Sequence, residues 1–235
     1  MGDSPYLGFD FMKVSIIIRA YNSEKTIKRA LESALNQDFP KQDFEVIVID
    51  DGSTDRTLKI LKPYQKKIRL IKQKHQGAIK SANLGFRIAQ GKYLILLDSD
   101  DFFEPTILKK MTAILDKNPK INFVYCDYYE KLISGNLKIV STKNIFNILA
   151  CGVMYRKKNL KKEGFYHEDL KLPEYDLLLK AQKKWRGYHI PKPLYHFNRG
   201  KGSLSKKKQW VKEALAELKR LHPQKIKEIQ KIRNF

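Results

Sequence analysis

The sequence has few cysteines and no long apolar run, and both absences exclude classes of protein. Its two cysteines, Cys126 and Cys151, show neither metal-binding nor redox spacing, so we expect buried free thiols in a reducing compartment. No stretch approaches the roughly 18 apolar residues that a membrane-spanning helix needs. Residues 1–12, expected to form an N-terminal arm, lack the features of a signal peptide and the myristoylation pattern. The sequence therefore predicts a cytoplasmic protein.

Motifs of several binding folds are also missing. No G-x-G-x-x-G follows the first apolar segment, which excludes a dinucleotide-dependent dehydrogenase. The glycine-rich, arginine-containing N-terminal loop of a sugar-nucleotide pyrophosphorylase is absent. Because there is no zinc-ligand spacing, aromatic RNA-binding string or helix-turn-helix signal, we expect no specific binding to nucleic acid.

Acidic residues are scarce: 25 Asp and Glu stand against 47 Lys and Arg, a net charge of +22. The excess is uneven, since residues 1–105 carry +3 and residues 106–235 carry +19. A basic half favours an anionic partner, such as a membrane surface, a phosphorylated acceptor or nucleic acid. A lysine-rich surface without a specific partner is the alternative.

Apolar strands and amphipathic helices alternate up to residue 118, a pattern typical of a parallel sheet covered by helices. We expect strands at 14–18, 44–49, 68–71 and 93–97. We expect helices after an N-cap at Ser23, at 56–64, at 78–89 closed by Gly91, and at 105–115.

The rhythm changes after residue 118. Segments 123–129 and 137–140 flank Ser134-Gly-Asn and predict a hairpin. A strand at 152–155, a helix at 174–184 and short strands at 188–190 and 194–197 follow. Residues 209–232 predict a basic helix, or a helix pair broken at Pro223. We find no repeat or linker, which predicts a single α/β domain with a C-terminal extension.

Two acidic clusters stand at the ends of apolar strands. The first spans 50–55 (Asp-Asp-Gly-Ser-Thr-Asp) and the second spans 98–101 (Asp-Ser-Asp-Asp). Open α/β folds bind ligands at the carboxyl ends of their strands. Clustered carboxylates repel one another unless a cation lies among them, and oxygen ligands suit Mg²⁺ or Mn²⁺. The clusters predict a metal-dependent enzyme that acts on a phosphorylated donor.

Several motifs, taken in order, resemble the family 2 glycosyltransferases of the GT-A fold. They lie at 14–22, 31–37, 45–55, 76–77 with 83–85, 91–101 with its Asp-x-Asp, and 173–177 (Pro-Glu-Tyr-Asp-Leu). The resemblance implies a Rossmann-like, mostly parallel sheet flanked by helices at 13–205, with a nucleotide-binding half at 13–105 and an acceptor half at 106–205. A small basic helical extension follows at 206–235.

The resemblance also implies that a sugar moves, with inversion, from a nucleotide-diphosphate donor, UDP above all, to a glycan or lipid-linked acceptor. Asp51 would bind the base or ribose, Asp98 the ribose, and Asp100, with Asp98 as a second candidate, the Mn²⁺ or Mg²⁺ ion. Ser53 or Asp55 would also suit a turn with a helix cap. The full predicted donor set is Ala20, Tyr21, Asn22, Asn83, Ser99, Asp51 and Asp98.

The general base implied by the resemblance falls at Glu174, where the family usually has Asp. Asp176 is the second candidate, but two residues along a helix turn the side chain by about 200°, so both cannot face one site. Candidate phosphate contacts are Arg19, Lys80, His196 and Arg199. Arg19 stands where the family often has Pro, and Ala82 where many members have Arg.

The basic extension has an apolar stripe at helical spacing, made of Trp210, Val211, Ala214, Leu215, Leu218 and Leu221. Such a helix either packs on the domain or lies on an anionic membrane, which would place the protein at the inner face of the membrane. For the chain as a whole, the alternative to catalysis is an impaired relic that binds nucleotide sugars or glycans. The replacement of the usual Asp by Glu174 is the argument for it.

Overall fold

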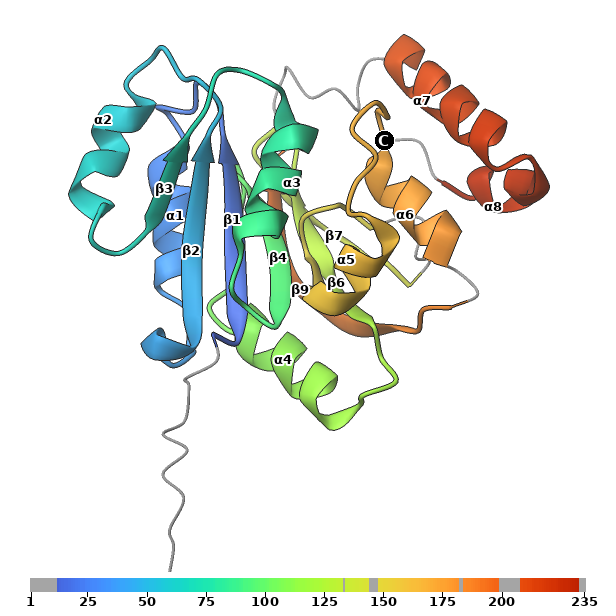
Figure 1. Cartoon of the computed structure of the whole chain (residues 1–235), viewed down its shortest axis with the longest axis horizontal. Coiled ribbons are helices and arrows are strands. Elements are labelled where there is room, and N and C mark those ends of the chain that lie inside the picture. Colours follow the sequence, from blue (N-terminus) through green and yellow to red (C-terminus); the bar gives the residue numbers. More distant parts are fainter. Residues whose placement is uncertain (1–11, 133, 144–147, 182–183, 199–207, 233–235) are drawn as a thin grey trace, which may run out of the picture.

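The computed structural model describes residues 12–132, 134–143, 148–181, 184–198 and 208–232. Its centre is a nine-stranded sheet in the order β3-β2-β1-β4-β8-β6-β9-β5, with β7 paired to β6 (Figure 1). Strands β1 (Val14–Ala20), β2 (Phe44–Asp50), β3 (Arg69–Lys72) and β4 (Tyr93–Asp98) are mutually parallel. This confirms the four strands that the alternating pattern predicts.

The second half of the sheet is mixed. Strand β8 (Val153–Arg156) runs antiparallel to both β4 and β6 (Phe123–Lys131), while β9 (Gly187–Asn198) runs parallel to β6. Strand β7 (Leu137–Val140) closes the predicted hairpin with β6. The two short strands expected at 188–190 and 194–197 are one strand, because register shifts beside Asp127 let β9 continue.

Helices flank the sheet, so the predicted α/β architecture is confirmed (Figure 1). Helix α3 crosses the front of the sheet in Figure 1 and α1 lies behind it. The helices are α1 (Ile27–Leu35), α2 (Thr57–Leu61), α3 (Ala78–Ile88), α4 (Ile107–Lys117), α5 (Lys157–Glu163), α6 (Pro173–Ala181), α7 (Lys208–Leu221) and α8 (Ile226–Ile229). Short 3₁₀ turns occupy Lys41–Asp43, Lys62–Tyr64 and Pro223–Lys225.

The core lies on both faces of the parallel strands. Side chains at 16–18, 46–49 and 94–97 are all buried, which explains why these strands are apolar without alternation. Each such side chain contributes about 1.5–3 kcal/mol to folding. Both cysteines are buried free thiols, as predicted. Among the described residues, we find no helix of the length and apolarity that a membrane crossing requires.

Several local expectations were wrong. Helix α1 begins at Ile27 after Thr26, because the Ser23 side chain bonds Ser99 instead of capping the helix. Gly91 does not close α3, which ends before Ala89. A Cβ on Gly91 would lie 2.5 Å from the Ser15 backbone nitrogen, so glycine permits close approach to β1. Helix α4 begins at Ile107, and the sequence patterns missed both α5 and the short strand β5 (Phe102–Phe103).

The basic extension packs on the domain as a helix pair broken at Pro223. Val211, Ala214 and Leu218 of its apolar stripe are buried, whereas Leu221 is 41% exposed. Beyond α7, the His222 Nε2 lies 2.8 Å from the Asp176 Oδ1. The stripe is therefore used in packing against the domain.

Candidate active site

A cavity of about 630 Å³ opens at the carboxyl ends of β1 and β4. Its walls come from the first turn of α3, residues 149–151, the segment 168–174 that leads into α6, and one residue of α7. Six carboxylates line it: Asp98, Asp100, Asp101, Glu168, Asp169 and Glu174. Among the described residues, the cations in its wall are Arg19, Lys80 and Lys171. The cavity is therefore acidic although the chain as a whole is strongly basic.

Asp98 ends β4 beside Arg19, which is one residue from the end of β1. The Arg19 Nε donates to the Asp98 Oδ1 at 2.9 Å, and the Arg19 Nη2 contacts the same oxygen. Parallel pairing of the two strands holds both residues at one edge of the sheet. Arg19 thus orients Asp98, and its predicted contact with a phosphate stays a prediction.

Asp100 lies in the cavity with one side open to solvent. Desolvation by the surrounding protein, together with the charge of Asp98, raises the pKa of Asp100 to about 6. The Arg29 Nη2 donates to the Asp100 carbonyl at 2.8 Å and so holds the loop. Burial and a neighbouring carboxylate thus disfavour the ionised form of Asp100.

The next residue, Asp101, is buried and serves the fold. It accepts hydrogen bonds from the Tyr195 hydroxyl and, at 2.7 Å, from the Asn198 backbone nitrogen. Asp101 therefore ties the acidic loop to β9. It does not cap the following helix, whose N-cap is Thr106.

Glu174 lies in the first turn of α6 and lines the same cavity as the two aspartates. Its burial, followed by the repulsion of Asp98, raises its pKa to about 7. A carboxylate with this pKa exchanges protons readily near neutral pH, as a general base must.

Asp176, the second candidate base, faces away from the cavity. Its Oδ1 is 2.8 Å from the His222 Nε2 and its Oδ2 is 2.7 Å from the Lys180 Nζ. The side chain is buried. Asp176 therefore anchors the C-terminal helices. As helix geometry predicts, the side chains of residues 174 and 176 face different sides of α6.

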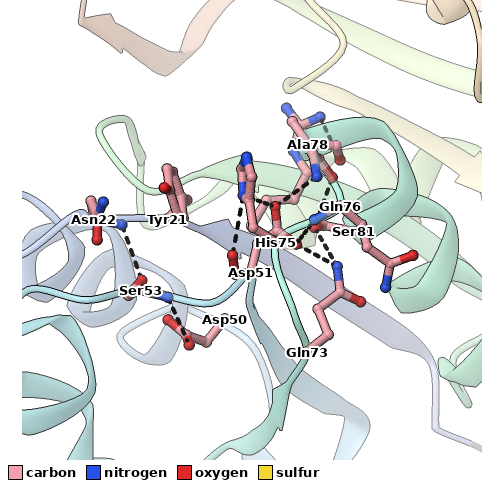
Figure 2. A network of polar contacts seen from close by, with 12 residues as sticks. Tyr21, Asn22, Asp50, Asp51, Ser53, Gln73, His75, Gln76, Ala78 and Ser81 are labelled. Atoms are coloured by element: carbon pink, nitrogen blue, oxygen red, sulfur yellow. Dashed lines mark hydrogen bonds and ion pairs between the residues drawn. The ribbon is translucent and has the colours of Figure 1, made fainter.

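A second group of predicted residues gathers where three loops meet at the ends of β1, β2 and β3 (Figure 2). The Asp51 carboxylate accepts from the Gln73 side chain at 2.6 Å and from the Gln76 and Gly77 backbone nitrogens at 2.9 and 2.8 Å. Burial alone would raise the pKa of Asp51, but these hydrogen bonds hold it below its ordinary value. Asp51 thus shapes the loop at 73–77, and its predicted donor contact stays a prediction.

The loop at 20–22 is built on main-chain contacts with the 50–55 loop. The Ala20 carbonyl accepts from the Asp51 nitrogen at 2.8 Å, and the Asn22 nitrogen donates to the Ser53 Oγ at 3.0 Å. Asn22 has a φ of 47°, a left-handed conformation that Asn tolerates better than most residues. Tyr21 is 46% exposed and stacks on His75 with the ring centroids 4.1 Å apart, as Figure 2 shows.

Asp50 is a candidate that the sequence analysis missed. It is buried at the end of β2, and its Oδ2 accepts from the Ser53 nitrogen at 3.3 Å. Among the described residues, its Oδ1 has no hydrogen-bond partner. A buried oxygen without a partner points to a ligand that the protein alone does not supply. The two adjacent acids are alike in sequence, and only their environments separate them.

The other predicted residues differ in how they relate to the cavity. Asn83 is buried, and its amide exchanges hydrogen bonds with the backbone of Tyr166 at 2.8 and 3.0 Å. His196 is 2.5 Å from the Glu104 Oε1 and stacks between Phe102 and Tyr129, outside the cavity. Ser99 bonds Ser23 beside the cavity, and Lys80 lies in its wall. Arg199 lies outside the described residues.

The described residues can hold a divalent cation only together with oxygen ligands from a bound substrate. Among the described residues, no group of three or more His, Cys, Asp and Glu side chains is arranged to hold a metal by itself. Magnesium sites in enzymes that act on nucleotides commonly use one or two carboxylates together with substrate phosphates. Asp98 and Asp100 match that composition.

Comparison with known proteins identifies the family. The family model described as glycosyl transferase family 2 matches residues 15–170. The poly(ribitol-phosphate) beta-N-acetylglucosaminyltransferase TarS of Staphylococcus aureus is 40% identical over 111 residues, which cover 46% of this chain and 19% of TarS. The chain thus spans much less than the full length of that relative. In Escherichia coli, the UDP-Glc:alpha-D-GlcNAc-diphosphoundecaprenol beta-1,3-glucosyltransferase WfaP is 31% identical over 215 residues, 86% of this chain and 84% of WfaP.

The fold agrees with these relatives. A crystal structure of S. aureus TarS residues 1–349 in complex with UDP-GlcNAc superimposes with a TM-score of 0.71 at 27% identity, covering 88% of this chain and 66% of that one. The predicted GT-A fold is thereby confirmed. From the matched family model and the length of the alignment with WfaP, we conclude that this chain belongs to glycosyl transferase family 2.

Proposed function

We propose that this chain transfers a sugar from a UDP-sugar to an acceptor hydroxyl by a single, inverting displacement with Glu174 as the general base. The observation that carries the proposal is that Asp98, Asp100 and Glu174 line one cavity while Asp176 is held elsewhere. Two carboxylates at the sheet edge suit a diphosphate with its cation. The third, with a pKa of about 7, suits removal of a proton from a hydroxyl.

The donor would bind across the three loops of Figure 2. The unpartnered Oδ1 of Asp50 is suited to accept an N–H from the base or a hydroxyl from the ribose. Tyr21 offers an exposed ring on which a base can stack. The TarS complex with UDP-GlcNAc supports UDP as the nucleotide, because that protein shares the fold over most of this chain.

We assign Asp98 and Asp100 as the protein ligands of one Mn²⁺ or Mg²⁺ ion that the donor diphosphate completes. When bound, the ion would neutralise the negative charge that develops on the departing nucleoside diphosphate. Arg19 holds the Asp98 carboxylate in place, and Arg29 fixes the backbone of Asp100. Burial, and after it the charge of Asp98, raises the pKa of Asp100, and a positive ion at this place would offset both effects.

The chemical step needs one proton transfer. A Glu174 oxygen takes the proton of the acceptor hydroxyl while the acceptor oxygen forms a bond to the anomeric carbon. The bond from that carbon to the diphosphate oxygen breaks on the opposite face, and its electron pair leaves with UDP. Attack from one face and departure from the other invert the anomeric configuration. Glu174 stands where the family usually has Asp, which is the argument for an impaired relic. The replacement nevertheless leaves a carboxylate in place for this step.

The acceptor is a glycan or a lipid-linked sugar, and the basic face of α7 is suited to an anionic membrane surface. Its exposed cations are Lys208, Lys212, Lys219 and Arg220. Each Lys or Arg near an anionic surface contributes about 1 kcal/mol. Replacing all four by Gln should reduce recovery on anionic vesicles without unfolding the chain, since none of the four is buried. Unchanged recovery would exclude this face as the contact.

The central test measures thermal stability and donor hydrolysis with UDP-GlcNAc and UDP-Glc, each with and without Mn²⁺. A donor should raise the melting temperature with metal present, by an amount set by its concentration relative to Kd. Asp100→Asn should remove most of the metal-dependent shift and lower hydrolysis at least about 100-fold. Lys110→Gln is the control, because it removes an α4 charge outside the cavity. Full metal-dependent activity in Asp100→Asn would refute the metal assignment.

A further inference from the structure

One residue of the cavity wall comes from the C-terminal helix α7, well beyond the segment 168–174 that lines the same cavity. Trp210 lies on α7, whereas the family model ends at residue 170. In Figure 1, α7 lies beside α6 at the end of the sheet where the strands β1 and β2 terminate. The C-terminal helix therefore contributes directly to the cavity that holds Glu174.

The position of Trp210 is set by the face of α7 that turns toward the domain. Trp210, Glu213 and Glu217 follow helical spacing and share one face. Glu217 accepts from the Lys171 Nζ at 2.7 Å and from its backbone nitrogen at 3.1 Å, and Glu213 is 3.5 Å from the same Nζ. Lys171 lies three residues before Glu174. These contacts hold the helix against the segment that carries the proposed base.

Trp210 is one of several apolar residues in the cavity wall. Leu149, Leu170, Leu172 and Phe197 line the cavity with it. Leu172 and Glu174 belong to the same wall segment, 168–174. Trp210 is half-buried and packs on the core while lining the cavity. A large ring at the edge of a polar site is suited to the apolar face of a sugar ring.

The charges of the cavity discriminate between acceptor types. Carboxylates outnumber cations in its wall. Two of the three cations are already in ion pairs, Arg19 with Asp98 and Lys171 with Glu217. The third, Lys80, lies on α3, beside the proposed donor loop at 73–77. Among the described residues, an additional phosphate in the cavity would therefore meet carboxylates and, apart from Lys80, only cations that are already in ion pairs.

We propose that Trp210 forms the acceptor subsite, on which an uncharged sugar unit of the acceptor stacks with its hydroxyl directed to Glu174. The proposal rests on the proposed function, and it adds the chemical class of the acceptor unit and a residue that selects it. Under this proposal the basic surface of the chain binds neighbouring anionic groups outside the cavity. The sugar that receives the transferred unit is itself neutral.

Fluorescence tests the subsite independently of turnover. The chain has two tryptophans, so Trp185→Phe leaves Trp210 as the single reporter. Trp185 packs on Phe123 and Tyr155 away from the cavity, and Phe keeps an aromatic ring there. In the presence of UDP and Mn²⁺, methyl β-D-glucoside and methyl N-acetyl-β-D-glucosaminide are titrated, with glucose 6-phosphate as the charged counterpart. We expect a saturable change in Trp210 emission with at least one neutral glycoside and at least about tenfold weaker binding of the phosphate.

Kinetics supplies the second readout. Trp210→Ala should raise the KM for the glycoside, used as acceptor, about tenfold or more, since loss of one stacked ring removes about 1.4 kcal/mol of binding. Trp210→Phe should restore part of the lost affinity. Leu221→Ala, on the same helix but exposed, is the matched control.

Two results would overturn the proposal. One is Trp210 emission unchanged by every neutral glycoside while UDP still stabilises the protein. The other is glucose 6-phosphate binding as tightly as the glycosides. Absence of donor binding and hydrolysis in the wild type would instead refute the proposed function, and the emission of Trp210 would still report whether the subsite binds a sugar.

Discussion

Replacing Glu174 by Gln separates its chemical role from its cost to stability. The pKa of Glu174 rises from its ordinary 4.5 to about 7 on folding. The folded state therefore binds more protons than the unfolded state between these values, and stability falls as pH rises through this window. At 1.36 kcal/mol per pKa unit, the ionised side chain costs at most about 3 kcal/mol above pH 7. Partial solvent access reduces this to about 1–3 kcal/mol.

Glu174→Gln has no ionised form, so it should be more stable than the wild type by that amount at pH 8 and about equal to it at pH 4. Its transfer rate should nevertheless fall by about 100- to 10,000-fold, the usual contribution of a general base. Glu174→Asp, which restores the residue usual in the family, should keep measurable activity. Donor binding should be unchanged in both variants.

The assay is the pH dependence of kcat/KM for transfer to a glycoside, together with denaturant unfolding at pH 4 and pH 8. In the wild type the rate should drop as pH falls below about 7, since at pH 6 only about one tenth of Glu174 is deprotonated. The reasoning fails if Glu174→Gln transfers sugar at more than about a tenth of the wild-type rate. It also fails if Asp176→Asn loses transfer as completely as Glu174→Gln does.

Two further predictions concern residues that hold the site in place. Asp176→Asn should lower the free energy of unfolding by about 2 kcal/mol, because it weakens the contacts with His222 and Lys180. The rate of donor hydrolysis per folded molecule should stay near the wild-type rate. An unchanged free energy of unfolding would show that Asp176 does not anchor the C-terminal helices. Gly91→Ala should cost at least about 1–3 kcal/mol, because its Cβ would lie 2.5 Å from the Ser15 backbone nitrogen. Gly135→Ala is the comparison, because Gly135 has a φ of 89° but no atom within 4 Å of the added Cβ. It should lower the free energy of unfolding by only about 1 kcal/mol. Equal losses of stability in the two variants would contradict the clash at Gly91.

Much of the fold could be read from local patterns. Strands such as 46–49 and 94–97 are buried on both faces of the parallel sheet, so their continuous apolar runs are plain in the sequence. The hairpin around Gly135 and the break at Pro223 follow from turn chemistry and from a missing backbone donor. Strand β5, with two residues, carries too little pattern to detect.

The candidate site likewise contains residues that the sequence predicts and residues whose roles only the structure distinguishes. Asp98, Asp100 and Glu174 were expected together, and the structure brings them to one cavity. Asp50 and Asp51 are neighbours of the same type, and only the contacts of Gln73, Gln76 and Gly77 show that Asp51 is already satisfied while one oxygen of Asp50 is not. His196 was grouped with the phosphate contacts because of its sequence neighbours, yet β9 turns it toward Phe102 and Tyr129.

The sequence by itself determined the family, the four parallel strands and the acidic strand ends, because these depend on residue type and on spacing along a short stretch of chain. Tertiary structure alone decided that Asp176 faces His222 and that Trp210 reaches the cavity of Glu174. Trp210 and Glu174 come together because α7 buries Val211, Ala214 and Leu218 against the domain and pairs Glu217 with Lys171. Such contacts join residues far apart along the chain, and the free energy that selects them belongs to the packed whole rather than to any local pattern.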